Sequence, residues 1–411
     1  MATTAGALPN KGARNNKVQK PRLNPDGTSK GYKEKIVSGP MDLTFFLIIM
    51  VLLVMGIIMM FSAGYAWAIN EGNSGTFYVK KQLTAAVLGL SGMFIMSFFD
   101  YHYLRKAWIA YGAYIGSAIL LVLCKVGPFK SPHNDSYRWV DFKIVPEFQP
   151  SEIMKFAIIL LFSYIISVNY SKMKEFKYGI VPFVGFLGVV CGLMLLQPHL
   201  SGTIIICSIG AIMMFVGGSK VSHLFLVGAV GIVLVIGIVF YLATTKGFTY
   251  FEKRFLTWQD PFNDEIKDIT WQTQNSLIAI GSGGLFGLGL GNSRQKFLYL
   301  PESKNDFVFA IVCEELGFVG ALMVIILFLL FIIRGFYIAT KSPDKFGMML
   351  AVGLTVQIGL QALLNIAVVT NTIPNTGVSL PFFSYGGTAL VMQLVQMGII
   401  LNISRQSLIE T

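Results

Sequence analysis

Long apolar stretches are the feature that most constrains this chain. A run of about 20 apolar residues is the length that an α-helix needs to cross the hydrocarbon core of a bilayer. Helices are expected there because each backbone polar group must be satisfied within the segment. The stretches lie near residues 41–63, 83–99, 107–124, 153–168, 179–196, 203–219, 222–243, 307–333, 346–369 and 384–403. They predict an all-α polytopic membrane protein with about ten transmembrane helices.

Charge gives the predicted orientation. Only 13% of the residues are charged, where a soluble domain has about a quarter. The formal net charge of +11 comes from basic residues in the first 40 positions and in the short connections after the second, fourth, sixth and eighth stretches. Short basic connections face the cytoplasm. We therefore expect both termini in the cytoplasm, and we attribute the charge to topology rather than to nucleic-acid binding.

The chain divides into two predicted parts. Residues 1–40 are rich in Lys, Arg, Asn, Gly and Pro without an apolar run, which predicts a disordered basic tail. Residues 41–411 form the predicted transmembrane domain. Its long outer connections cover residues 125–152 and, between helices 7 and 8, about 245–306. Long structured loops on one face of a protein often carry function.

Metal and nucleotide sites are not indicated. The Gly-rich stretch 281–293 lacks the Gly-Lys-Ser/Thr ending of a phosphate loop, so we interpret it as a flexible re-entrant turn, with close approach to a lipid head group as the alternative. No His or Cys has metal-ligand spacing. The cysteines are interpreted as small core residues: Cys124, Cys191, Cys207 and Cys313.

Asp306 ends the second outer connection and directly precedes the apolar residues "FVFAIV". In the sequence, Arg294, Lys296 and Lys304 surround Glu302 and Asp306. A carboxylate among cations suits acid–base chemistry on a phosphate-bearing substrate, with the cations holding the phosphates. Two simpler interpretations remain open at this stage. The charges can be ordinary ion pairs of a solvated loop, and Asp306 can simply cap the helix that follows.

Glu314 and Glu315 lie deeper in the same predicted span. Neighbouring helical positions point about 100° apart, so the two carboxylates are not expected to share one partner. Carboxylates within a membrane usually face a cavity or a cation. We expect one of them to face an internal cation or polar backbone. A structural role and a catalytic role are balanced on the sequence alone, and we assign neither residue to catalysis.

The first outer connection offers a second candidate. Pro150 and Ser151 mark a helix start, and Glu152 and Lys155 lie three residues apart on one helix face. A lysine in the first turn of a span is a functional candidate. The alternative is a Glu152–Lys155 pair whose lysine extends outward to water. Arg138, next to a tryptophan, is suited to holding a phosphate.

Residues 371–391 carry no charge and resist helix formation until about Ser384. At membrane depth such backbone must be buried in protein or line a wet cavity. The stretch predicts a re-entrant loop that floors a site, with a transporter's broken helix as the alternative. The residues assigned to its shape are Pro374, Gly377, Pro381, Gly386 and Gly387.

These motifs together resemble the SEDS family, named for shape, elongation, division and sporulation, whose members include FtsW and RodA. The resemblance covers roughly residues 41–405 and is closer to the FtsW and sporulation branch than to RodA. It rests on "RW" (138–139), "QPSEIMK" (149–155), "QPHLSGT" (197–203), "GLGLGNSRQKFLYLPE" (287–302), "NDFVFAIVCEELG" (305–317) and "PNTGVSLPFFSYGG" (374–387).

The resemblance implies a peptidoglycan glycosyltransferase in the bacterial cytoplasmic membrane that polymerises lipid II at its outer face. The family's essential aspartate falls on Asp306, which would act as general base, and its phosphate-binding cations fall on Arg138 and Lys155. Gln274, Lys296, Glu302 and Ser384 are further predicted substrate contacts, and Glu152 and Glu315 are predicted to be structural. Lys304–Asn305 replaces the His-Thr that often precedes the aspartate, and His199 and Ser201 depart from the family's usual motif.

The implied partners are lipid II, a class B penicillin-binding protein and other membrane proteins of the divisome or elongasome. No cofactor is assigned, and assistance by a divalent cation stays open. Two other functions also fit ten spans with intramembrane charges: a lipid II flippase, and a scaffold for a penicillin-binding protein without activity of its own. The sequence does not decide between division, elongation and sporulation.

Overall fold

The structure is a computed structural model that describes residues 39–125, 130–133, 136–140, 147–197, 200–231, 255–263 and 267–406. The predicted disordered tail lies almost wholly outside these residues and stays a prediction. The same holds for part of each long outer connection and for the Arg138 side chain.

Eight helices within the described residues are long and apolar enough to cross a membrane. Two shorter apolar helices lie at the two remaining predicted positions, namely Ser201–Val216 and Val221–Gly231, and the second ends where the described residues end. The all-α polytopic fold is thus confirmed. The eight long helices are built on α1 (Leu43–Asn70), α2 (Phe77–Phe98), α3 (Ala107–Lys125), α4 (Pro150–Asn169), α5 and α6 (Phe176–Gly179 and Val181–Leu195), α11 (Val308–Thr340), α12 (Lys345–Val369) and α13 (Gly387–Arg405).

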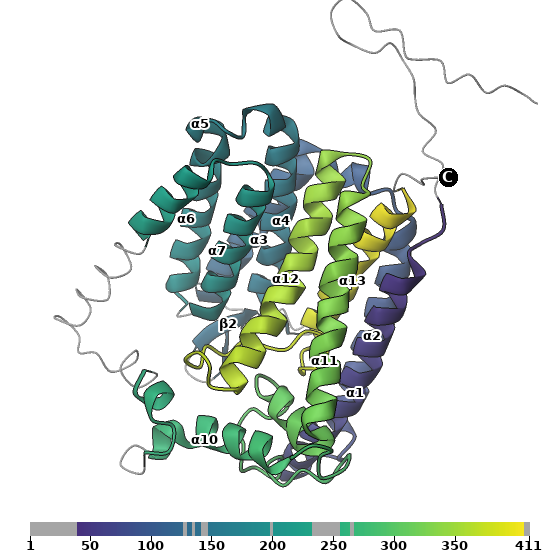
Figure 1. The fold of residues 1–411 in the computed structure, drawn as a ribbon, viewed down its shortest axis with the longest axis vertical. Helices are drawn as coiled ribbons and strands as arrows, with labels where there is room; N and C mark the ends of the chain where they lie inside the picture. Colours follow the sequence, from purple (N-terminus) through teal and green to yellow (C-terminus); the bar gives the residue numbers. More distant parts are fainter. Residues whose placement is uncertain are drawn as a thin grey trace, which may run out of the picture. The chain divides into compact units, whose positions relative to one another are not determined.

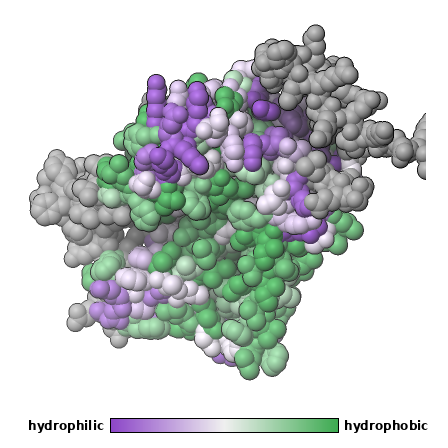
Figure 2. Space-filling model, turned by 45° about the horizontal axis from the view of Figure 1, so that its top comes forward, coloured by the Kyte–Doolittle hydropathy of each residue, from purple (hydrophilic) through white to green (hydrophobic). Residues whose placement is uncertain are grey.

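Burial separates central helices from outer ones. In α4 and α12, 72% of the most apolar window is buried, against 28% in α3. The exposed side chains of the outer helices are themselves apolar, as at Val87, Ile95 and Phe98. Figure 2 shows hydrophobic residues over the middle of one face and hydrophilic residues gathered toward its two ends. So large an apolar surface is typical of a protein that lies in lipid.

Shorter elements lie at the two ends of these helices (Figure 1). What we call the loop end carries α10 (Lys267–Ser282), residues 283–306 and residues 370–386. What we call the basic end carries η1 (Tyr101–Arg105), η2 (Tyr170–Lys172), α5 and residues 341–344. Gly39 donates a backbone hydrogen bond of 2.7 Å to Arg405 at the basic end. The beginning and the end of the described membrane domain therefore lie together at the basic end, as an even number of spans predicts.

A small β-hairpin was not predicted. Strands β1 (Lys130–His133) and β2 (Ser136–Val140) pair antiparallel, with Ser131 opposite Trp139. Val140 also pairs with Phe148, just before α4 begins. The hairpin therefore lies within the first outer connection, and its second strand contacts the residues that lead into α4.

Candidate functional site

Asp306 lies at the loop end, two residues before the first residue of α11. The helix begins at Val308, and its N-cap residue is Phe307, with no side-chain cap hydrogen bond. The interpretation of Asp306 as a helix cap is therefore wrong. Asn365 of α12 donates to the backbone oxygens of Asp306 and Val378, both at 2.6 Å. This one buried amide therefore links the Asp306 backbone to residues 370–386, which we call the re-entrant loop.

The re-entrant loop lies against the Asp306 carboxylate. Gly377 has a φ of +68°, and a Cβ atom there would lie 3.1 Å from Asp306 Oδ2. Glycine thus fits both the backbone conformation and the close approach. Pro374 and Pro381 lie within the same irregular stretch, and α13 begins at Gly387, slightly later than the predicted start near Ser384. A loop beside the predicted site is what the sequence led us to expect.

Ser384 connects this loop to the residue before Asp306. Its hydroxyl donates to the Asn305 carbonyl at 2.6 Å and accepts the Leu380 amide hydrogen at 2.7 Å. Gln82 of α2 binds the same loop, donating to Ser384 O at 3.2 Å and accepting from Gly386 N at 3.3 Å. These contacts give Ser384 a structural function. Its predicted contact with substrate stays a prediction.

Glu302 lies beside Asp306 in a strained backbone position. Its φ is +54°, in the left-handed region that non-glycine residues rarely occupy. The Asn305 side chain donates to Glu302 Oε2 at 2.5 Å. Glu302 thus shapes the turn that leads to Asp306, and its predicted contact with substrate is still untested.

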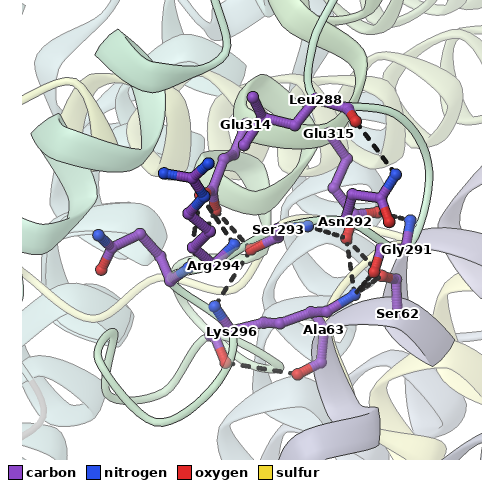
Figure 3. A network of polar contacts seen from close by, with 12 residues as sticks. Ser62, Ala63, Leu288, Gly291, Asn292, Ser293, Arg294, Lys296, Glu314 and Glu315 are labelled. Carbon is purple, nitrogen blue, oxygen red and sulfur yellow. Dashed lines mark hydrogen bonds and ion pairs between the residues drawn. The ribbon is translucent and has the colours of Figure 1, made fainter.

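Glu314 and Glu315 are buried and both bind residues 291–295 (Figure 3). The Ser293 backbone N–H donates to Glu315 at 3.2 Å, and the Ser293 hydroxyl donates to Glu314. The expectation that the two carboxylates would not share a partner is wrong. The backbone N–H and the side-chain hydroxyl of Ser293 point in different directions, so this one residue donates a hydrogen bond to each of the two diverging carboxylates.

Lys296 supplies the internal cation that we expected for one glutamate. Its Nζ lies 3.0 Å from Glu315 Oε1, which also accepts the Ser62 hydroxyl at 2.6 Å. The Lys296 side chain is 4% exposed and that of Glu315 is 0% exposed. The structural assignment of Glu315 fits this geometry. Lys296 is held inside the protein here, and its predicted contact with substrate stays a prediction.

The Gly-rich stretch docks onto α11 where that helix is broken. Gly317 has a φ of 67° and a ψ of −166°, which interrupts the helical hydrogen bonds. Leu288 and Gly289 donate backbone hydrogen bonds to Glu314 and Glu315 at 2.9 and 3.0 Å. Phe318 and Val319 donate in return to Gly284 and Leu285 at 2.9 and 3.1 Å. The turn is held by these backbone bonds, in contrast to the flexible turn that its composition favoured.

The second predicted site is an ion pair inside α4. The helix begins at Pro150, as expected, and Lys155 Nζ lies 2.7 Å from Glu152 Oε1. The pairing that the alternative predicted is thus confirmed, but the Lys155 side chain is only 3% exposed, so the predicted extension outward to water is wrong. Arg138 lies on β2, and its side chain is outside the described residues. Gln274 lies half-buried on α10.

An open hollow lies beside the glutamate network. It has a volume of about 640 Å³ and is lined by residues 291–295 together with Phe297 and Tyr299. Arg294 contributes an exposed cation to it. Among the residues that the structure describes, no three His, Cys, Asp or Glu side chains group closely enough to hold a metal ion.

The contacts thus assemble the predicted residues into three groups. Asp306, Glu302, Ser384 and Gly377 meet at the start of α11. Lys296 and Glu315 belong to the buried network, and Lys155 and Glu152 form their own pair.

Four polar residues that support the Asp306 segment were not predicted from the sequence. Asn365 and Gln82 bind the neighbouring backbone, as described above. Glu71 and Tyr78, at the turn between α1 and α2, contact Lys304, two residues before Asp306. The available signal was an uncharged polar residue within or beside an apolar stretch, as at Asn365.

Known proteins resemble this chain over most of its length. The family model described as "Cell cycle protein", which covers FtsW, RodA and SpoVE, matches residues 42–408. Stage V sporulation protein E of Bacillus subtilis is 36% identical over 366 residues, covering 89% of this chain and 97% of that protein. The probable peptidoglycan glycosyltransferase FtsW of a Geobacter species is 34% identical over 363 residues, covering 88% and 96%.

Solved structures agree with the fold. One chain from the structure titled "Structural coordination of polymerization and crosslinking by a peptidoglycan synthase complex" aligns with a TM-score of 0.71 and 26% identity, covering 89% of this chain and 98% of that one. The crystal structure of the Thermus thermophilus rod shape determining protein RodA aligns with a TM-score of 0.63 and 24% identity, covering 89% and 97%. With the family model and the sequence relatives, these matches show that the chain is a multi-pass bacterial cytoplasmic membrane protein of the FtsW/RodA/SpoVE family.

Proposed function

We propose that this protein is a peptidoglycan glycosyltransferase that polymerises lipid II at the outer face of the cytoplasmic membrane. The observation that supports this proposal most is the position of Asp306. Its carboxylate lies at the start of a span without capping the helix, and its backbone is held by α12. The names of the FtsW relatives support the reaction class.

In this mechanism, Asp306 accepts the proton of the GlcNAc 4-hydroxyl on the acceptor lipid II. The hydroxyl oxygen attacks the anomeric carbon of the lipid-linked donor chain, and a new glycosidic bond forms. The bond from that carbon to the pyrophosphate oxygen breaks, and undecaprenyl pyrophosphate leaves with the electron pair. A positioned carboxylate base contributes about 10²–10⁴-fold to such a rate.

Charge on the leaving pyrophosphate needs nearby cations. Arg138 and Lys155 are the proposed ones. Because Glu152 already balances the charge of Lys155, we expect Lys155 to contribute less than an unpaired cation would. The proposal assigns no cofactor. Adding a chelator of divalent cations to the polymerisation assay tests whether a metal ion assists.

A class B penicillin-binding protein is the proposed partner. A structural neighbour of this chain comes from a complex that coordinates polymerisation with crosslinking. Polymer made by this chain would be crosslinked by such a partner. Polymerisation is therefore best measured with and without it.

The decisive experiment is glycan polymerisation from labelled lipid II by purified protein carrying Asp306→Asn. We expect lipid II binding to persist and polymerisation to fall by about 10²–10⁴-fold. Asp260→Asn changes an exposed aspartate of the same loop and serves as the matched control. Normal polymerisation by the Asp306 variant would refute the base assignment. If the protein in vesicles moves lipid II across the membrane and makes no polymer, the lipid II flippase is favoured instead.

A further inference from the structure

Lys304 lies two residues before Asp306, and its ammonium group is enclosed at the turn between α1 and α2. The Nζ atom lies 3.2 Å from Glu71 Oε1 and 2.6 Å from the Tyr78 hydroxyl. It also lies 3.9 Å from the centre of the Tyr78 ring and 5.0 Å from that of Trp67. One cation thus meets a carboxylate, a phenol oxygen and two aromatic faces.

This arrangement gives the Lys304 cation more partners than a simple surface ion pair would, although the Glu71 side chain is 39% exposed. Exposed pairs contribute little because water and salt screen them. Here the Lys304 side chain is 12% exposed, and aromatic faces attract a cation more strongly as water is removed. The Tyr78 hydroxyl also donates to Glu71. Burial alone would raise the pKa of Glu71, but the hydrogen bonds from Tyr78 and Lys304 hold it below its usual value, so Glu71 stays ionised.

The residues on either side of Lys304 form hydrogen bonds with several separate elements of the fold. Trp67 Nε1 donates to the Ser303 hydroxyl at 2.9 Å. Tyr385 N donates to the Lys304 carbonyl at 2.8 Å. The next two carbonyls, of Asn305 and Asp306, accept from Ser384 and Asn365 as described above. Each residue from 303 to 306 thus accepts a hydrogen bond from another part of the fold. The Lys304 side chain also links this segment to the turn after α1.

We propose that Glu71, Tyr78 and Lys304 form a positioning clamp that sets the orientation of the Asp306 carboxylate, so that the turn between α1 and α2 controls the rate of proton removal. The proposal rests on the proposed function of Asp306. These residues act through Asp306 and do not touch the reacting atoms. A small displacement of a reacting group from its productive geometry can cost about 100-fold in rate.

The competing role for Lys304 is direct contact with the substrate's pyrophosphate. The two roles predict opposite kinetics. A phosphate-binding lysine affects mainly KM, and freeing it from Glu71 should lower KM. A clamp affects mainly kcat, and removal of either Lys304 or Glu71 should have the same effect.

The test is the polymerisation assay with the full chain and its penicillin-binding protein partner. The variants are Lys304→Met, Glu71→Gln, their combination and Lys304→Arg. Lys106→Met is the matched control, because Lys106 also lies over an aromatic ring, 5.1 Å from the centre of Tyr103, but is exposed at the basic end. Thermal denaturation of each variant in detergent reports whether it is folded.

We expect Lys304→Met and Glu71→Gln each to lower kcat about 10- to 100-fold with KM within about twofold of the wild type. The double variant should be no worse than the poorer single variant, because both changes break one unit. Arginine should restore most of the activity, and Lys106→Met should behave like the wild type. If Lys304→Met does not fold, Glu71→Gln still decides, because Glu71 lies at the exposed end of α1.

Three outcomes would overturn the clamp: a rise in KM with unchanged kcat, multiplicative effects of the two changes, or wild-type activity of Glu71→Gln. Asp306→Asn in the same assay separates the two proposals. If that variant polymerises normally, the proposed function fails. If it is inactive while Lys304→Met and Glu71→Gln are fully active, only the clamp fails.

Discussion

The two ends of the membrane domain use aspartates before helices in different ways. At the basic end, Asp42 accepts the Phe45 amide hydrogen at the start of α1, and Asp344 accepts those of Phe346 and Gly347 at the start of α12. At the loop end, Asp306 precedes α11 without capping it. An aspartate near a helix start therefore caps the helix at the basic end and lies beside the re-entrant loop at the loop end.

Partners explain the difference. Asp42 also pairs with Arg334 at 2.7 Å, and Asp344 with His102 at 3.2 Å, so each joins two helices. The Asp306 segment is held by the Asn365 amide, which binds the Asp306 backbone, and by contacts to residues 303–305. The Asp306 carboxylate itself lies beside Gly377 of the re-entrant loop, whereas those of Asp42 and Asp344 cap helices.

The largest expected effect is a loss of polymerisation rate when a buried asparagine at the loop end is replaced, compared with one at the basic end. Asn365→Leu removes the donors to the Asp306 and Val378 carbonyls, whereas Asn402→Leu removes contacts to Tyr101 and Ser97 at the basic end. Leaving a buried backbone N–H or carbonyl unpaired costs about 1–3 kcal/mol, so both variants should be less stable. Asn365→Leu should in addition lose about 100-fold in kcat.

Polymerisation per folded molecule, measured beside thermal denaturation, checks this contrast. Equal loss of specific activity in both variants would mean that the Asn365 contact supports the fold in general. It would not then be assigned to the orientation of Asp306.

The next effect compares two ion pairs. Lys296→Met leaves Glu315 buried without its cation and should destabilise by about 3–5 kcal/mol. Arg334→Met breaks a pair whose arginine is 34% exposed, and Asp42 keeps its helix-capping bond, so the cost should be about 0–1 kcal/mol. Thermal denaturation in detergent measures both. The double variant Lys296→Met with Glu315→Gln should recover part of the loss, and failure to recover would place the cost in packing rather than in charge.

Hydropathy and turn chemistry predicted the features that depend on local sequence. The apolar stretches located the helices, and the prolines and glycines of residues 371–391 located the re-entrant loop. The start of α4 at Pro150 also followed from local signals. These features depend on the solvent around each segment and on backbone limits, both of which are visible in the sequence itself.

Long-range partners were not predictable in the same way. Lys155 was predicted either to serve a functional site or to pair with Glu152 while extending outward to water, and only the packing around α4 shows that it is paired and buried. Glu71 lies 233 positions from Lys304, and nothing near either residue indicates their pairing. Substrate contacts at Gln274 and Arg138 stay predictions for the same reason, because a ligand is one more long-range partner.

The smallest expected effect is a pH dependence confined to the basic end. There the His102 ring lies between Asp344 and Asp100, with nitrogen–oxygen distances of 3.2 and 2.7 Å. The hydrogen bond to Asp344 raises the pKa of His102 above its usual value, against the lowering effect of burial, and Asp100 adds to the rise. Burial would raise the pKa of Asp344, but hydrogen bonds from His102, Tyr101 and Gly347 lower it to about 2.

The raised pKa means that the stabilisation from His102 is complete below its unfolded value of about 6.5 and is lost as the pH rises through the folded value. The lowered pKa means that the stabilisation from Asp344 is present above about 4 and is lost as the pH falls toward 2. Thermal stability should therefore be greatest between about pH 4 and 6.5 and should decline by about 1–3 °C toward pH 9.

His102→Gln should flatten that decline, while His223→Gln, which changes a histidine outside this contact, should leave it intact. Because the contact lies at the end opposite to Asp306, the acidic limb of the polymerisation rate should be the same in the wild type and in His102→Gln. A shift of that limb in the His102 variant would show that the two ends are coupled, and the division between a structural basic end and a functional loop end would then have to be abandoned.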